Sequence, residues 1–347
     1  MKNGLIHLLL GAMLALLAMG VTSPALLEEP AGQGPTLYGC AVALAVLVGI
    51  IALGVERRRE ETPALPPVAG TAVCLILGGL IGARLAYCLI RLPYYLNEVG
   101  IVHALAIREG GFLLYGALLG ILAAVALRTR GGWSYTRKAS LPDGPVIQLL
   151  RVQKGSFAAA MDELALPGML TIMLARLSEG FAGEGLGNWV EDEALWRFPF
   201  AAQNSYGEYQ WAIFAAEAAA ALLILLIAAR VRKGEGERAL TAVLLYACCQ
   251  VVFESLRMDS VLKIGFVRVS QVASAVAILA VTLLRSRKCA VKTTLLRVLF
   301  FACCVGAVGG IEWALDKTPI SNGLLYMGMI AACALLCINA RKRKGIS

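Results

Sequence analysis

The sequence predicts an all-α polytopic membrane protein, and three observations predict this fold class. The mean hydropathy is +0.74. Hydrophobic residues make up 59% of the 347 positions and charged residues only 16%, whereas soluble domains average about 25% charged residues. Apolar runs of about 20 residues, enough to cross a hydrocarbon core of about 30 Å, recur along the whole chain. An ordinary cytosolic protein is therefore excluded.

Charged breaks divide the apolar sequence into about ten runs, each of which predicts a spanning helix. They lie near residues 4–23, 36–55, 68–92, 111–128, 164–181, 209–231, 239–256, 265–284, 294–315 and 322–340. The first run also fits a cleaved secretory signal peptide, because Met1 and Lys2 precede it and small residues end it.

Lysine and arginine predict the orientation of these spans, because short cytoplasmic loops carry an excess of them. The basic clusters fall in alternate loops, at Lys2 and residues 57–59, 128–138, 230–238, 285–292 and 341–344. The intervening loops hold few bases. Both termini are therefore predicted to be cytoplasmic. The same loops account for the net charge of +9, so this charge does not indicate a nucleic-acid partner.

Two connecting segments are long. Residues 129–163 hold Pro142-Asp143-Gly144 and scattered bases, which predicts a cytoplasmic surface loop. Residues 182–208 hold several acidic and aromatic side chains. We expect them to form a small acidic cap at the outer membrane surface.

Sequence motifs for metals and nucleotides are missing. The ten cysteines lack the paired spacing of a zinc site, and the two histidines, His7 and His103, share no motif. No glycine-rich nucleotide loop occurs. We therefore expect neither a metal nor a cofactor.

Three arginines interrupt or end predicted spans: Arg84, Arg176 and Arg257. A charge at mid-bilayer costs about 2.5–3.5 kcal/mol on insertion scales, so such a residue is a functional hypothesis by default. A single arginine can also extend to the membrane interface. All three, and the turn Glu109-Gly110-Gly111, lie on the predicted outer half. Together they predict a basic pocket for a phosphate head group.

At these residues the chain resembles the bacterial prolipoprotein diacylglyceryl transferases, over about residues 36–285. Early motifs similar to the family's are Tyr38-Gly39, Gly82-Ala83-Arg84-Leu85, and Glu109-Gly110-Gly111 followed by Tyr115-Gly116. The signature maps onto residues 175–184, where Arg176, Gly183 and Glu184 match, with Gly187 beyond it. Later matches are Gln210, Glu217, Tyr246, Glu254, Arg257 and Gln271. The order and spacing of these motifs carry the resemblance.

Four departures from the family pattern fall within these motifs. Tyr115 replaces the family's histidine, and Gln250 replaces the arginine before Glu254. Glu179 and Ala182 replace the signature's asparagines. Ala212-Ile213 replaces the Tyr-Glu that follows Gln210 in the family.

The resemblance implies a seven-helix transferase-like core at 36–285, with the outer cap at about 182–208. An extra N-terminal transmembrane helix and outer linker would occupy 1–35, and two extra C-terminal transmembrane helices would occupy 286–347. The family's location implies the bacterial plasma membrane, with the site toward the outer face.

The resemblance also implies an activity. The family moves diacylglyceryl from phosphatidylglycerol to the lipobox cysteine thiol in the signal peptide of a prolipoprotein and releases glycerol phosphate, without a cofactor. Arg176 and Arg257 would neutralise the phosphate, and Glu184 and Glu254 would orient them. Tyr115 and Glu179 are the two candidates for the group that accepts the thiol proton. The expected substrate-binding residues are Tyr38, Arg84, Glu109, Gly110, Gly111, Glu179, Gly183, Gly187, Gln210, Tyr246, Glu254 and Gln271.

Two other function classes stay open. One is a lipid-binding paralog on the same fold that has lost catalysis through the four departures. The other is a small-solute transporter, which predicts charges near the midplane and repeat symmetry between halves. The charges lie on the predicted outer side instead, and the sequence shows no such symmetry.

Overall fold

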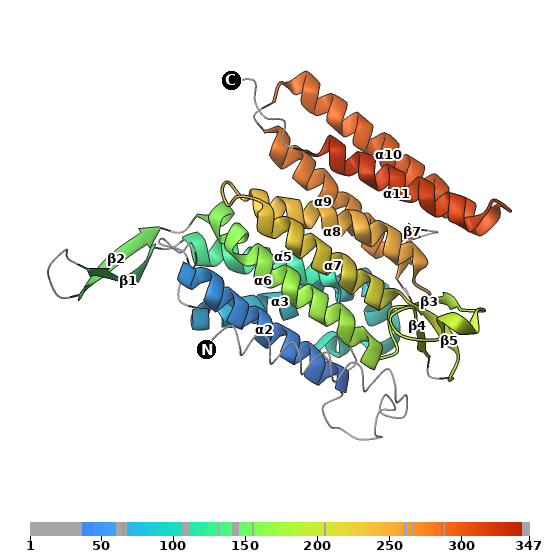
Figure 1. Ribbon diagram of the computed structural model, residues 1–347, viewed down its shortest axis with the longest axis horizontal. Helices are drawn as coiled ribbons and strands as arrows, with labels where there is room; N and C mark the ends of the chain where they lie inside the picture. Colours follow the sequence, from blue (N-terminus) through green and yellow to red (C-terminus); the bar gives the residue numbers. More distant parts are fainter. Residues whose placement is uncertain are drawn as a thin grey trace. The chain divides into compact units, whose positions relative to one another are not determined.

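The computed structural model describes residues 37–59, 65, 68–105, 111–130, 132–140, 146–154, 156–204, 206–259, 262–264, 267–287 and 289–341, and most of these are helical (Figure 1). The α-helices are α2 (Leu37–Arg59), α3 (Val68–Ile90), α4 (Leu92–Tyr94), α5 (Leu114–Arg130), α6 (Phe157–Ser178), α7 (Ile213–Arg230), α8 (Glu237–Leu256), α9 (Val269–Ser286), α10 (Val291–Lys317) and α11 (Asn322–Asn339). The strands are β1 (Gly132–Ser140), β2 (Val146–Lys154), β3 (Leu186–Trp189), β4 (Ala201–Gln203), β5 (Tyr209–Ala212), β6 (Lys263–Ile264) and β7 (Val267–Arg268).

The described helices confirm a multi-pass membrane protein. Eight of them are long and apolar enough to cross a membrane, namely α2, α3, α6, α7, α8, α9, α10 and α11. The predicted span at 111–128 is α5, which has 17 residues and is slightly shorter than these eight. The predicted span at 4–23 lies outside the described residues.

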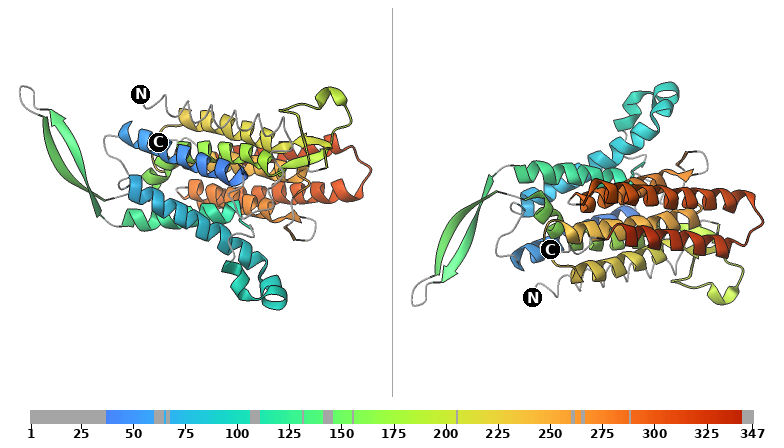
Figure 2. Two further views of the ribbon diagram at one scale, coloured as in Figure 1. Left: turned by 90° about the horizontal axis from the view of Figure 1, so that it is seen from below. Right: turned by 90° about the horizontal axis from the view of Figure 1, so that it is seen from above.

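The segment 129–163, predicted as a surface loop, contains regular secondary structure instead. Strands β1 and β2 form an antiparallel hairpin that pairs Gly132 with Lys154 and Ser140 with Val146, and α6 begins at Phe157. Both strands are rich in β-branched and aromatic residues, which favour extended pairing. Figure 2 shows the hairpin extending beyond the end of α5.

The segment at 182–208 folds into a cap built on a three-stranded antiparallel sheet in the order β3-β5-β4. Gln210, on the central strand, pairs with Trp189 of β3 and Ala202 of β4. The prediction that a helix begins at residue 209 is therefore wrong for four residues. Residues 209–212 complete the sheet, and α7 begins only at Ile213.

The chain divides into two compact units, and each is described by itself. The second unit contains Ile50–Leu164 and Lys233–Glu237. In it α3 and α5 pack at close range through glycines, because a side chain on Gly120 would overlap the carbonyl of Gly78, and one on Gly82 would overlap Gly116. Small residues allow membrane helices this close approach.

Carboxylates also tie the second unit together. Asp162 accepts hydrogen bonds from the backbone N–H groups of Gly234 at 2.7 Å and Gly236 at 3.2 Å. Lys233 forms an ion pair with Glu56 at 2.8 Å. Asp162 thus holds the turn between α7 and α8.

The first unit contains Met1–Gly49, Ala165–Arg232 and Arg238–Ser347. One apolar cluster joins α2, α6, α7 and the cap around the fully buried Phe214. A second joins α8 and α9 to α10 and α11, which run side by side (Figure 1). In the second cluster Gln271 of α9 donates to Glu312 of α10 and to the carbonyl of Val251 at 3.2 Å. These two clusters fix the ends of α6 and α8, where the candidate site lies.

Candidate active site

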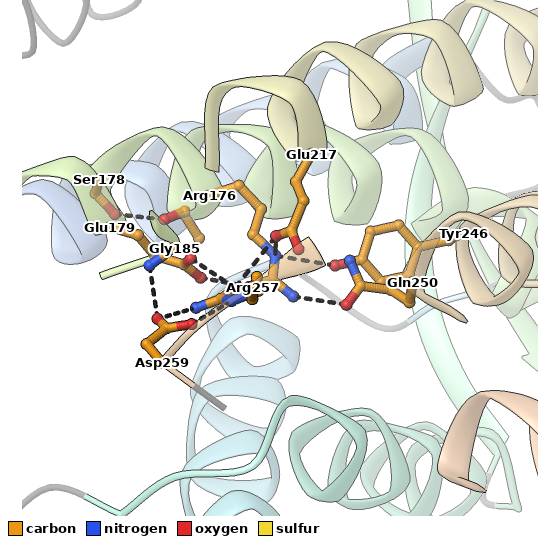
Figure 3. Close-up of polar contacts among 10 residues, drawn as sticks. Arg176, Ser178, Glu179, Gly185, Glu217, Tyr246, Gln250, Arg257 and Asp259 are labelled. Atoms are coloured by element: carbon orange, nitrogen blue, oxygen red, sulfur yellow. Dashed lines mark hydrogen bonds and ion pairs between the residues drawn. The ribbon is translucent and has the colours of Figure 1, made fainter. Parts of the chain in front are cut away.

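Arg176 and Arg257 meet in the first unit, although they lie 81 positions apart in the chain (Figure 3). Arg176 lies in the last turn of α6, and Arg257 directly follows α8. The backbone N–H of Met258 donates to the carbonyl of Leu186 in β3 at 2.9 Å. This bond fixes the end of α8 against the cap.

Four side chains hold the guanidinium of Arg176. Its Nε donates to the hydroxyl of Tyr246 at 3.2 Å and lies 2.8 Å from Oε2 of Glu217. Its Nη1 donates to Oε1 of Glu179, and its Nη2 donates to Oε1 of Gln250 at 3.1 Å. The side chain is therefore fixed by α7, α8 and the turn after α6.

Three carboxylates hold Arg257. Asp259 accepts from its Nε at 2.9 Å and its Nη2 at 2.8 Å, the two-point geometry that guanidinium favours. Nη1 lies 2.9 Å from Oε2 of Glu179 and 3.4 Å from Oε2 of Glu217. Glu179 and Glu217 thus bridge the two arginines.

Glycines shape the turn that places Glu179. Gly183 and Gly185 have φ values of +63° and +71°, a backbone region that residues other than glycine rarely adopt. The N–H of Gly185 donates to Oδ2 of Asp259 at 2.7 Å. A side chain on Gly187 would lie 2.9 Å from Ile213. The Gly183 and Gly187 matches are thus explained by backbone conformation and by close packing.

Nearly every polar atom of the cluster has a partner. All six guanidinium nitrogens are engaged, as are both carboxylate oxygens of Glu179 and Asp259. Two buried atoms of the cluster have none among the described residues, Oε1 of Glu217 and Nε2 of Gln250. Both residues are only 1% exposed. An unsatisfied buried polar group costs about 1–3 kcal/mol, so both atoms have capacity for a further hydrogen bond.

Three ionisable groups at or near the cluster lie outside the membrane-spanning helices, and burial and neighbouring charges shift their pKa values. Burial alone raises the pKa of Asp259, but the hydrogen bond from Arg257 and its positive charge hold that pKa below its usual value. Burial opposes the charge of Arg257, whereas the hydrogen bond to Asp259 and the charge of Glu179 raise its pKa. Partial desolvation, followed by the charges of Glu179 and Asp259, raises the pKa of Glu184.

Arg84 belongs to the second unit and has a different kind of partner. Its Nε donates to the carbonyl of Ala104 at 2.9 Å, Nη2 to that of His103 at 3.1 Å and Nη1 to that of Gly111 at 3.4 Å. Ala104 and His103 belong to the short 3-10 helix Ile101–Leu105. Arg84 therefore binds the backbone of its own unit through side-chain donors.

The other predicted site residues divide between the two units. Tyr38 packs against the α2–α6–α7 cluster, Gln210 is buried in the cap, and Glu254 is buried on α8. Tyr115 lies in the first turn of α5, in the second unit. Glu109 and Gly110 lie outside the described residues.

Glu184 and Glu254 were expected to orient the arginines, whereas the carboxylates bonded to the two guanidiniums include Glu179, Glu217 and Asp259. The side chain of Glu184 is exposed, and its backbone N–H donates to the carbonyl of Glu179 at 3.1 Å.

Glu217 and Asp259 contact the two arginines, although neither is among the site residues predicted from the sequence. Glu217 is an acidic residue inside an apolar run, and an ionisable residue in such a run indicates a functional site, as it does for the three arginines. Asp259 follows Arg257 by two positions, but its contact with Gly185 joins residues 74 positions apart. Only the fold shows that second contact.

The chemistry of the cluster suits an anionic group that enters by exchange. Two guanidiniums face three carboxylates, which gives a formal charge of −1 when all are ionised. Guanidinium binds phosphate oxygens in the same forked geometry as carboxylates. A phosphate can therefore bind both arginines only where a carboxylate gives up its contacts.

Comparisons with known proteins identify relatives. A model of the prolipoprotein diacylglyceryl transferase family matches residues 35–141 and 144–286. A phosphatidylglycerol–prolipoprotein diacylglyceryl transferase from Synechococcus elongatus is 30% identical over 292 residues, 77% of this chain and 88% of the relative. The Symbiobacterium thermophilum protein of that name is 29% identical over 71% of this chain and 86% of its own. One from Fusobacterium nucleatum is 39% identical over 90 residues, 26% of this chain and 30% of its own.

Proposed function

Because the chain belongs to the prolipoprotein diacylglyceryl transferase family, we propose that it transfers diacylglyceryl from phosphatidylglycerol to the lipobox cysteine of a prolipoprotein. It is a multi-pass membrane transferase, and its substrates are a membrane lipid and a signal peptide.

One observation supports this function beyond family membership. Arg176 and Arg257, which match the family's motifs, come from separate helices to one cluster with shared carboxylates. The reaction needs positive charge where the phosphate leaves, and fixed donors at that point lower the barrier. Two adjacent guanidiniums supply it.

The reaction exchanges one bond at the glyceryl carbon. The cysteine sulfur attacks the carbon that bears the phosphate ester, a carbon–sulfur bond forms, and the carbon–oxygen bond to phosphate breaks. The thiolate is the nucleophile, so the thiol must lose its proton. Glycerol phosphate leaves with the electron pair of the broken bond, and the arginines stabilise its charge.

The remaining parts of the chain have proposed roles as well. The alternating basic loops support cytoplasmic termini and a site toward the outer face. The boundaries 1–35, 36–285 and 286–347 describe a core with helices added at both ends. Arg84 binds the backbone carbonyls of residues 103, 104 and 111 and acts on the lipid only indirectly.

Reconstitution tests the proposal. The purified protein is mixed with phosphatidylglycerol vesicles and a lipobox peptide, and mass spectrometry measures the diacylglyceryl adduct. We expect an adduct from the wild type and none from Arg176→Ala or Arg257→Ala. Wild-type protein that retains phosphatidylglycerol but forms no adduct would contradict the transferase and identify a lipid-binding paralog. The replacements Tyr115 and Gln250 favour that second candidate.

A further inference from the structure

Among the described residues of the arginine cluster, one buried carboxylate oxygen has no hydrogen-bond donor. Oε2 of Glu217 contacts Nε of Arg176 at 2.8 Å and Nη1 of Arg257 at 3.4 Å. Its Oε1 is buried and has no partner among the described residues. Because carboxylate oxygens accept hydrogen bonds, Oε1 is an acceptor held inside the site without a donor.

We propose that Glu217 accepts the proton of the lipobox thiol and that its protonation releases Arg176 and Arg257 for the leaving phosphate. This inference rests on the proposed transferase function and names a catalytic residue for it. The thiol is the donor that the free oxygen lacks.

The proposed steps balance. The S–H bond breaks and its proton moves to Oε1 of Glu217, which leaves a thiolate. The thiolate attacks the glyceryl carbon, the carbon–sulfur bond forms, and the carbon–oxygen bond to phosphate breaks with its electron pair on oxygen. The proton on Glu217 then passes to the departing glycerol phosphate or to water, which restores the carboxylate.

Protonation of Glu217 also explains how the phosphate gains access to occupied arginines. A neutral carboxylic acid binds guanidinium more weakly than a carboxylate does, because a hydrogen bond between two charged groups is roughly twice as strong as a neutral one. The proton from the thiol therefore weakens the hold of Glu217 on both arginines. Their donors are released as negative charge develops on the phosphate.

The other candidate acceptors for this proton are either engaged by arginine or weak bases. Glu179 uses Oε1 for Arg176 and Oε2 for Arg257, and Asp259 uses both oxygens for Arg257. An unperturbed tyrosine such as Tyr115, with a pKa of about 10, is a poor base at neutral pH. Among the buried carboxylates of the cluster that the structure describes, only Glu217 offers an oxygen without a donor, and the carboxylate of Glu184 is exposed.

The central experiment compares Glu217→Gln with the wild type on two lipobox peptides, one with cysteine and one with selenocysteine. The selenol is already ionised at neutral pH and needs no base. With the cysteine peptide we expect adduct formation to fall about 10²- to 10⁴-fold, the usual effect of losing a general base. With the selenocysteine peptide we expect Glu217→Gln to recover by at least about tenfold.

A pH series adds a second readout. Raising the pH ionises the thiol in solution, so the defect of Glu217→Gln with cysteine should shrink. Charged and titratable groups around Glu217 are Arg176 on α6, Glu179 in the following turn, Tyr246 and Glu254 on α8, and Arg257 after it. They are unchanged in the variant, so the difference between the two pH profiles reports Glu217.

Glu179→Gln is the matched control, because Glu179 bridges the same two arginines without a free oxygen. It should lower adduct formation equally with both peptides. Glu217→Asp keeps a carboxylate and should retain more activity than Glu217→Gln. Retained phosphatidylglycerol and an unchanged gel-filtration profile show that each variant is folded.

The outcomes separate the two proposals. A wild type that forms no adduct with either peptide overturns the transferase, and the inference with it. A working wild type with an unaffected Glu217→Gln, or with a defect of equal size on both peptides, overturns only the inference. If Glu217→Gln does not fold, the same comparison on Glu217→Asp decides: a defect that selenocysteine does not relieve contradicts the assignment.

Discussion

Arg84 and the pair Arg176–Arg257 look alike in the sequence but differ in the hydrogen-bond acceptors that the described residues offer them. Arg84 donates to backbone carbonyls of residues 103, 104 and 111, whereas the paired arginines are held by side-chain carboxylates. A carbonyl neither titrates nor changes rotamer, but a carboxylate can do both. An arginine held by carboxylates can therefore exchange them for a ligand, and one held by backbone carbonyls fixes a chain segment.

The largest expected difference between the two regions is the effect of replacing an arginine with lysine on adduct formation. Arg257→Lys keeps the charge but loses the forked contact with Asp259, because an ammonium group is a point charge. We expect adduct formation to fall at least about 100-fold, as when one oxyanion donor is removed. For Arg84→Lys we expect adduct formation to fall less than about tenfold, and the main effect should be a lower melting temperature.

Both variants are measured by adduct mass spectrometry, beside a melting curve in detergent. Equal losses in two variants that melt like the wild type would refute the distinction. Arg84 would then belong to the lipid site, as the sequence prediction had it.

The pH dependence of stability should differ between the regions. The pKa of Asp259 is lower in the folded protein than its usual value. Its stabilisation is therefore fully present above the usual pKa of about 4 and disappears as the pH falls through the lowered value. At neutral pH, Asp259→Asn should lower the free energy of unfolding by about 1–2 kcal/mol. The value is kept small because the carboxylate is partly exposed and solvent screens its charge.

Melting temperatures between roughly pH 7 and pH 3 test this sign. The difference between wild type and Asp259→Asn should shrink toward zero at the acid end. Arg84→Met is the comparison, because the described acceptors of Arg84 are backbone carbonyls, which do not titrate, and its deficit should change less with pH. A deficit of Asp259→Asn that persists at low pH would show that the ion pair is not its source.

The spans could be predicted from sequence because the membrane sets their length and composition. The run predicted at 239–256 is α8 at Glu237–Leu256, and the run at 322–340 is α11 at Asn322–Asn339. The strands could not, since β5 depends on pairing with both β3 and β4. Short strands have little identity without their partners.

The arginines of the site could be predicted and their partners could not. A charge in an apolar run is visible in the sequence, which is how Arg176 and Arg257 were found. The contact of Arg257 with Glu217 joins residues 40 positions apart, and the carbonyl partners of Arg84 are invisible at the level of residue type. The distinction between an exchangeable and a fixed arginine therefore required the structure.

One glycine with positive φ in each region allows the backbone strain of the two regions to be compared. Gly111, with φ +75°, precedes α5 and accepts from Arg84 through its carbonyl, and a Cβ there would lie 2.5 Å from the ring of Tyr87. Gly183, with φ +63°, has open space around it. Both alanine variants carry backbone strain of about 1–3 kcal/mol, and Gly111→Ala adds the overlap with the ring.

The melting temperature of Gly111→Ala should therefore be lower than that of Gly183→Ala, and both should be lower than that of the wild type. Tyr87→Ala removes the ring, so the double variant should recover part of the loss of Gly111→Ala relative to Tyr87→Ala alone. Equal effects for the two glycines would mean that the close approach to Tyr87 adds nothing.

The smallest expected effect belongs to Glu184, whose pKa is raised in the folded protein, opposite in sign to that of Asp259. An acid with a raised folded pKa reduces stability once the pH exceeds its unfolded pKa, because ionisation is easier in the unfolded chain. Glu184→Gln should therefore raise the melting temperature slightly at neutral pH and leave it unchanged below about pH 4. Because this side chain is exposed, salt should diminish the gain. A lower melting temperature at neutral pH would mean instead that the Glu184 carboxylate supports the arginine cluster, as the sequence-based role for Glu184 requires.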